Sequence, residues 1–335
     1  MTSISHQPSQ SAPLPRTTHS RGGLVAAGIL AAAVTLAGCS TSTPSSSASP
    51  SPAASASTTA APATTSTAKV PVVAGFYPLA YAAQRVGGDA VDVVDLTKPG
   101  AEPHDAEPTT ADVATVRKSR VILTVKGFQP AVDALVAQAT AEQKVVDATT
   151  VPGAIGNLAT SEGVDLHFWL DPTHYSAYVA GVADALAAVD PARADTYRKN
   201  ADALRTELTA LDTAYSTGLA TCQSRTLVTG HEAFGYLAKR YGLTQVGIAG
   251  LNPDQEPTAK QLAAVADTVR TAKVGTIYSE TLVDAKFAQT VASSTGAKLA
   301  VLDPVEGIST TSAGSDYLGV MRSNLETLRL GQGCA

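Results

Sequence analysis

Cysteine, methionine and tryptophan are scarce in this chain of 335 residues, which contains three, two and one of them, and only 16% of its residues are charged. The apolar run at residues 24–37 falls short of the roughly 20 residues that a membrane-spanning helix needs. The formal net charge of −5 argues against nucleic acid as a partner. Gly235 stands where a HExxH zinc hydrolase has its second histidine, and there is no Gly-x-Ser-x-Gly elbow. These absences argue against two common classes of hydrolase.

Residues 1–38 have the features of an export signal. Arg16 and Arg21 supply positive charge, residues 24–37 are almost wholly apolar, and small residues follow. The four residues that end at Cys39, Leu-Ala-Gly-Cys, resemble a bacterial lipobox, in which cleavage precedes the cysteine and that cysteine carries the lipid. We therefore predict that Cys39 is the lipidated first residue of an extracytoplasmic protein anchored to the cell membrane. The alternative is an ordinary cleaved signal with an incidental cysteine.

Residues 39–68 are expected to form a disordered tether. After Cys39 they are almost only Ser, Thr, Ala and Pro, without a charge or an aromatic side chain. Such a segment cannot bury enough apolar surface to offset the entropy lost on ordering. As a flexible coil it would span on the order of 30 Å, enough to hold a folded domain clear of a membrane surface.

Cys222 and Cys334 remain once Cys39 carries the lipid. An even number of cysteines in an oxidising compartment predicts a disulfide. Because this disulfide would close a long loop, it would be worth on the order of 4 to 5 kcal/mol in the chain-entropy model. The alternative is a pair of buried free thiols.

The rest of the chain alternates apolar strands with amphipathic helices. Before residue 190 the pattern predicts strands at 70–74, 91–95, 121–125 and 144–147, with helices at 78–86, 110–118 and 130–139. A single long helical pattern then occupies residues 191–219. The alternation resumes with strands at 225–229, 244–247, 276–279 and 298–302, and with helices at 232–241, 258–271, 284–294 and 316–330. We therefore predict an α/β fold of two lobes, 69–190 and 221–335, each with a mostly parallel sheet flanked by helices, joined by one long rigid helix at 191–220.

The stretch 164–175 holds His167, His174 and the single tryptophan, Trp169. Imidazole is the commonest metal ligand among side chains, so a metal site is one interpretation of His167. A packed, hydrogen-bonded core histidine is the other. We expect His174 to be a capping or surface residue, and Trp169 to pack beneath the site.

Further potential ligands follow predicted strands. His104 lies in the loop after the second strand, and His231, Glu280 and Asp303 each follow a strand of the second lobe. In open parallel sheets, ligands bind outside the carboxyl ends of the strands, so two lobes that meet at such edges would form one cleft. From position alone, the metal site and the core histidines both remain possible.

Five motifs run through the folded part of the chain: PGAEPH at 99–104, DLHFWLDP at 165–172, VTGHEAFGYL with YGL at 228–243, GLNPDQEPT at 250–258 and LDP at 302–304. In this order they resemble the zinc and manganese solute-binding lipoproteins of ABC transporters. The resemblance implies one metal ion in the cleft between the lobes. It also implies a monomeric receptor that delivers the ion to a membrane permease and its ATPase.

The resemblance assigns His104, His167, His231 and Asp303 as the metal ligands. Three imidazoles and one carboxylate suit tetrahedral Zn²⁺. Mn²⁺ is the alternative, although manganese receptors of this family usually have a glutamate where His231 stands.

Two departures from the family pattern bear on the site. Asp105 stands where the family often has an aromatic residue and Glu102 lies nearby, so the fourth ligand could be Glu102 or water instead of Asp303; Glu280 is a further alternate. Residues 148–163 contain no histidine, whereas many zinc receptors of the family carry a His-rich loop in this lobe.

Two rival functions fit a metal site as well. A secreted zinc-dependent hydrolase would keep three protein ligands and an open water position. An adhesin-type lipoprotein on the same scaffold would use the metal for stability. For the receptor, we expect metal affinity to fall below about pH 6.5, because binding needs neutral imidazoles. We also expect metal release to involve only a small motion, which frees the second-lobe ligands first.

Overall fold

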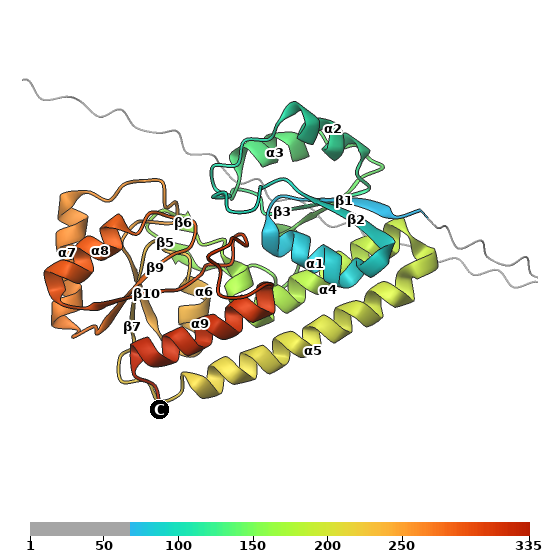
Figure 1. The fold of residues 1–335 in the computed structure, drawn as a ribbon. Helices are drawn as coiled ribbons and strands as arrows, with labels where there is room; N and C mark the ends of the chain where they lie inside the picture. The colour runs from blue at the N-terminus through green and yellow to red at the C-terminus, as the bar shows by residue number, and fades with distance from the viewer. Residues whose placement is uncertain (1–67) are drawn as a thin grey trace, which may run out of the picture. The chain divides into compact units, whose positions relative to one another are not determined.

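The computed structural model describes residues 68–335 (Figure 1). The export signal, Cys39 and nearly all of the expected tether lie outside these described residues, so the predictions for them stay predictions. Within the described range, no helix combines the length and the hydropathy needed to cross a membrane.

The first lobe is a parallel four-stranded sheet with helices on both faces (Figure 1). Successive residues of a strand point to opposite faces: Val72 packs on the side of α1 and α4, and Val73 on the side of α2 and α3. The strand order is β2-β1-β3-β4, from β1 (Val70–Ala74), β2 (Val91–Asp95), β3 (Val121–Thr124) and β4 (Lys144–Asp147). The helices are α1 (Tyr77–Gly87), α2 (Thr110–Lys118), α3 (Pro130–Val136) and α4 (Pro172–Val189).

The second lobe repeats this plan with a second parallel sheet. Val228 and Ile277 pack on one face against α7 and α8, while Leu227 and Tyr278 on the other face belong to the core that α6 and α9 complete. The strand order is β10-β9-β7-β8, from β7 (Thr226–Thr229), β8 (Thr244–Gly247), β9 (Thr276–Ser279) and β10 (Lys298–Val301). The helices are α6 (Gly235–Tyr241), α7 (Ala259–Thr271), α8 (Lys286–Thr295) and α9 (Tyr317–Gln332).

The long helix α5 (Ala194–Gly218) has 25 residues and joins the lobes (Figure 1). Its buried stripe packs against α1 and α4 of the first lobe and α9 of the second. Asn200 donates to the Val86 carbonyl at 3.0 Å, and the buried Tyr215 hydroxyl donates to the Met321 carbonyl at 2.6 Å. One hydrophobic core therefore continues from the first lobe through α5 into the second.

A disulfide joins Cys222 to Cys334, the pair that the cysteine count predicts, across a sequence separation of 112 residues. It ties the chain end after α9 to the segment that leads into β7.

The predicted α/β fold with two lobes and a linking helix is confirmed, and most of the observed elements begin and end within two residues of their expected bounds. The expected elements give no bounds for α4, which has 18 residues, and they do not include the small antiparallel hairpin of β5 (Ala159–Thr160) and β6 (Gly163–Val164). The described part of the chain also contains four short 3₁₀ turns: η1 (Gly88–Ala90), η2 (Ala148–Thr150), η3 (Phe168–Leu170) and η4 (Pro191–Arg193).

Candidate metal centre

Three imidazoles and one carboxylate from distant parts of the chain converge between the lobes. His104 comes from the loop after β2 and His167 from the residue before η3, whereas His231 follows β7 and Glu306 follows β10. One ligand atom from each of these four side chains lies within 4.8 Å of the other three. Segments that follow strands of both lobes therefore meet at one point, in keeping with the rule that ligands bind outside the carboxyl ends of parallel strands.

The spacing of these atoms matches a tetrahedral zinc site. Oε1 of Glu306 lies 3.8 Å from Nε2 of His104, 3.2 Å from Nε2 of His167 and 3.5 Å from Nε2 of His231. A tetrahedron with ligand bonds of about 2.1 Å has edges of about 3.4 Å. The imidazole nitrogens lie within 4.8 Å of one another, so the side chains would draw together around an ion at the centre.

These atoms are buried and have no hydrogen-bond partner. The Nε2 atoms of all three histidines and both carboxylate oxygens of Glu306 lack one among the described residues. Side-chain exposure is 9% for His104, 1% for His167 and 0% for His231 and Glu306. Buried polar atoms are almost always paired, so a cluster of unpaired ones that face each other indicates a site that a cation would fit.

Two carboxylates orient two of the imidazoles. Asp165 accepts from the backbone N–H of His167 at 2.9 Å and lies 2.8 Å from its Nδ1. Glu280 does the same for His231, at 2.8 Å from the backbone N and 2.5 Å from Nδ1. With Nδ1 hydrogen-bonded outwards, Nε2 of each ring is free to face the centre, as in metal-bound histidines generally.

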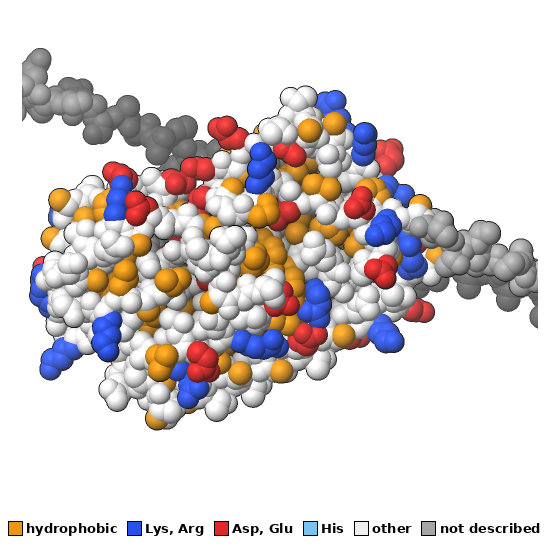
Figure 2. Space-filling view, viewed as in Figure 1, with side chains coloured by type: hydrophobic (Ala, Val, Ile, Leu, Met, Phe, Trp, Pro, Cys, Tyr) orange, Lys and Arg blue, Asp and Glu red, His pale blue; other side chains and the backbone are white. Residues whose placement is uncertain are grey.

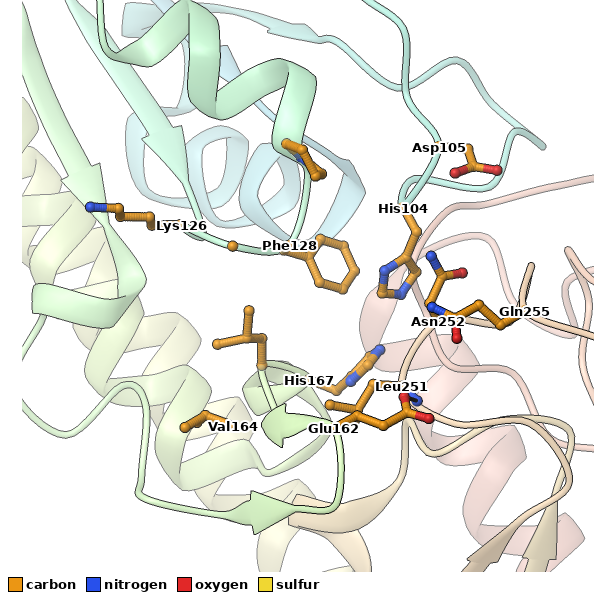
Figure 3. A pocket seen from close by; sticks show the side chains of 13 residues that line it. His104, Asp105, Lys126, Phe128, Glu162, Val164, His167, Leu251, Asn252 and Gln255 are labelled. Carbon is orange, nitrogen blue, oxygen red and sulfur yellow. Dashed lines mark hydrogen bonds between the residues drawn. The ribbon is translucent and has the colours of Figure 1, made fainter. Parts of the chain in front are cut away.

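His104 is held differently, by packing. Its ring centroid lies 4.1 Å from that of Phe128, and Figure 3 shows the two rings side by side above His167. Its backbone N–H donates to Glu102 Oε1 at 3.1 Å. His104 is therefore the one imidazole of the cluster without an orienting carboxylate among the hydrogen bonds of the described residues.

The electrostatics of the cluster separate the three imidazoles. Burial lowers the pKa of His104 to about 3, although Glu306 opposes this shift. Burial also acts to lower the pKa of His167 and of His231, but the neighbouring carboxylates outweigh it and raise both above the ordinary value. Burial acts to raise the pKa of Glu306, but the imidazoles beside it hold that pKa well below its usual range. Glu306 is therefore a carboxylate, which is the form that binds a metal.

The structure brings Glu306 to the cluster, where Asp303 was expected. The Asp303 carboxylate instead accepts from the Val305 backbone N–H at 2.8 Å and from the Ser312 hydroxyl at 2.9 Å. Val305 has a φ of 58°, a left-handed conformation that is rare and costly for a β-branched residue. The turn that Asp303 stabilises therefore directs the side chain of Glu306, three residues later, into the site.

The remaining predicted residues lie around this cluster. Glu280 contacts the outer nitrogen of His231, as described, and is not one of the four converging groups. Glu102 is also outside the group, and burial together with the charge of Glu306 raises its pKa to about 8. His174 lies in the first turn of α4 with Nδ1 2.9 Å from the Gly153 carbonyl, away from the cluster. Trp169 packs against His167 at a ring distance of 5.2 Å and donates to the Pro304 carbonyl at 2.8 Å.

The sequence does carry a signal for Glu306, although Glu306 was not singled out. It is an acidic residue that follows a strand and a Pro, between Val305 and Gly307. Its distance of three residues from Asp303 makes the two carboxylates hard to tell apart without knowing the backbone of the turn.

A cavity of about 640 Å³ leads from the surface to His104 and His167. Figure 3 shows side chains of both lobes around it, with Lys126 and Glu162 from the first and Leu251, Asn252 and Gln255 from the second. On the face shown in Figure 2, basic and acidic side chains are interspersed over the surface. Because the cavity is lined by His104 and His167, it is a path by which a small ion could reach these imidazoles.

A family model described as ZnuA, zinc-uptake complex component A periplasmic, matches residues 72–331. The zinc-binding protein AdcA of Streptococcus pyogenes is 33% identical over 291 residues, which cover 78% of this chain and 56% of the relative. This chain thus spans little more than half the length of that curated relative.

Two solved structures resemble the chain over nearly their whole length. The Zn(II)-bound ZnuA-like domain of Streptococcus pneumoniae AdcA has a TM-score of 0.69 and 34% identity, covering 79% of this chain and 99% of that one. The laminin-binding protein Lmb of Streptococcus agalactiae, described as a bifunctional protein with adhesin and metal-transporting activity, has a TM-score of 0.71 and 34% identity. That match covers 78% of this chain and 98% of that one.

Proposed function

This chain belongs to the family of the zinc-uptake complex component A, and from that premise we propose that it is the receptor that captures Zn²⁺ for an ABC uptake system. The ion is bound between the two lobes by His104, His167, His231 and Glu306. It is then passed to a membrane permease driven by its ATPase.

One observation carries this proposal: four buried ligand atoms from both lobes lie within 4.8 Å of one another, and none has a hydrogen-bond partner among residues 68–335. Three imidazole nitrogens and a carboxylate oxygen form a borderline-soft donor set, which suits Zn²⁺ in tetrahedral geometry. Mn²⁺ prefers oxygen ligands, so we propose zinc as the cargo and manganese as a poor competitor.

A receptor fits this centre better than a hydrolase does. Catalytic zinc keeps three protein ligands and an open position for water. Here four buried side chains would fill the tetrahedron, which leaves no place for a nucleophilic water. An adhesin role is stated for the relative Lmb, and no contact among the described residues 68–335 favours it here.

The surroundings of the receptor are also part of the proposal. We expect lipidation at Cys39 to hold it on the outer face of the membrane as a monomer, with residues 40–68 as the tether. The continuous core through α5 supports a small change at the site, not a wide hinge motion, when the metal leaves.

Elemental analysis of the purified protein tests the proposal directly. We expect about one zinc per chain after exposure to an equimolar mixture of zinc and manganese, and a loss of most of it in a His231→Ala variant. A His174→Ala variant is the matched control, because it removes a histidine outside the cluster. Protein that binds no zinc, or that loses it equally in both variants, would refute the proposed site.

A further inference from the structure

The segment between β4 and His167 starts and ends in the first lobe but contacts the second. We call residues 156–165 the interlobe strap. It follows η2 and ends two residues before His167, and in between it forms the β5–β6 hairpin. Three separate contacts fasten it to the second lobe, and none of them is made by one of the four proposed metal ligands.

The first contact holds the start of the strap. The Tyr236 hydroxyl at the beginning of α6 accepts from the Gly156 backbone N–H at 3.1 Å and donates to the Gly156 carbonyl at 3.0 Å. A single side chain of the second lobe thus satisfies both backbone groups of one strap residue.

The second contact lies at the tip of the hairpin. Thr160 pairs with Gly163, so Ser161 and Glu162 form a tight turn, and Gly163 has a φ of 134° that glycine alone adopts readily. Glu162 Oε2 accepts from the Leu251 backbone N–H at 2.8 Å, across the mouth of the cavity (Figure 3).

Residue 250 has to be glycine for this contact to form. A Cβ placed on Gly250 would lie 2.0 Å from Oε1 and 2.2 Å from Oε2 of Glu162. The backbone of Gly250 is not left-handed, so the close approach of the carboxylate, not the local conformation, is what excludes a side chain.

The third contact joins the strap to the metal centre. Asp165, which orients His167, lies so close to α6 that a Cβ on Gly235 would be 2.4 Å from its Oδ2. The carboxylate of Asp165, which orients His167, therefore packs against the second lobe. Detachment of the strap would loosen Asp165 and, through it, His167.

We propose that Glu162 is a positioning residue that fastens the interlobe strap to the second lobe and thereby sets the rate at which the bound metal leaves. This inference rests on the proposed capture of zinc at the cluster. The absence of histidine from residues 148–163 is consistent with it, because the segment then serves to fasten the lobes and not to collect metal.

The test is the rate of zinc dissociation from the purified protein into an excess of chelator, measured by stopped flow. Loss of one net hydrogen bond of about 1 kcal/mol corresponds to about a fivefold change. We expect Glu162→Ala to release zinc about fivefold faster, with an association rate within about twofold of the wild type. Ser161→Ala, the neighbouring exposed residue of the same turn, should release zinc at the wild-type rate.

Further variants distinguish positioning from general damage. Glu162→Gln keeps an oxygen that accepts from the Leu251 N–H and should restore much of the slow release. Gly250→Ala removes the same contact from the other lobe, so the Glu162→Ala/Gly250→Ala double variant should be no faster than the faster single variant. The absorption spectrum of the Co²⁺-loaded protein should not change, because the four proposed ligands remain.

Additive effects of the two substitutions, or release from Glu162→Ala at the wild-type rate, would overturn the inference. If the wild type itself binds no zinc, the proposed function fails and the inference fails with it. If the wild type binds zinc and only the release rates of the variants differ from those expected, the inference about Glu162 fails and the proposed function stands.

Discussion

Replacing Glu306 by glutamine is the sharpest test of the metal centre. Glu306 is fully buried, and its Oε1 lies between 3.2 and 3.8 Å from three imidazole nitrogens. Glutamine has almost the same shape, so Glu306→Gln removes the negative charge and leaves the packing intact. The substituted amide is a weak ligand for Zn²⁺, because it is neutral.

The size of the effect follows from the burial. Removing one partner of a buried charge pair costs about 3 to 5 kcal/mol. In a dissociation constant this is roughly two to three and a half orders of magnitude. Asp303→Asn is the matched control, because asparagine keeps an oxygen for the Val305 N–H. Substitutions of residues that position a metal ligand lower metal affinity about 10- to 100-fold, and we expect the loss of zinc affinity in Asp303→Asn to lie at the lower end of that range.

Both affinities can be measured by competition with a chromophoric zinc chelator, with circular dichroism to verify that each variant is folded. In competition with the same chelator, Asp303→Asn should still bind zinc, whereas Glu306→Gln should lose its zinc to the chelator. The opposite order, in which Asp303→Asn loses zinc and Glu306→Gln retains it, would show that Asp303 is the fourth ligand. It would also refute the inference drawn from the unpaired oxygens of Glu306.

Three further predictions concern the pH dependence of zinc affinity, the stability contributed by the disulfide and the stabilisation of the fold by bound zinc. The raised pKa of His231 means that the metal-free site binds a proton more tightly than an ordinary imidazole does, so protons already compete with zinc above about pH 6.5. Zinc affinity, measured by titration calorimetry, should therefore begin to fall above about pH 6.5 and continue to fall as the pH is lowered. Replacing Cys222 and Cys334 by serine should lower the free energy of unfolding in urea by up to about 4 to 5 kcal/mol, with the zinc stoichiometry unchanged; an unaltered midpoint would contradict this. Zinc at 1,000 times its dissociation constant should stabilise the fold by about 4 kcal/mol, seen as a higher melting temperature that a chelator reverses, and the Glu306→Gln variant should show far less of this stabilisation at the same zinc concentration.

The fold was readable from the sequence because its signals are local. Most strands of both sheets contain a short apolar run, and the periodic apolar residues of 191–219 are the ones that α5 buries. The β5–β6 hairpin was missed, because each of its strands has only two residues and little apolar alternation. Tertiary contacts such as Glu162 to Leu251 support it, and no local pattern reports them.

The site was readable only in part. His104, His167 and His231 could be selected because the chain has few histidines and family motifs surround these three. The carboxylate was assigned to Asp303, because that residue follows its strand directly. A hydrogen bond from Val305 to Asp303 and the left-handed backbone of Val305 direct Glu306 inwards instead. The conformation of a single residue therefore changes which carboxylate faces the histidines.

By itself the sequence predicted most of the elements and their parallel arrangement, because apolar periodicity is a property of the chain alone, and its resemblance to a known family implied a centre of three imidazoles and one carboxylate. Only the tertiary structure decided which atoms share one point in space, which carboxylates orient them and how the strap crosses between the lobes. These depend on distances between residues far apart in the chain. Such distances are set by the packing of the two lobes around α5.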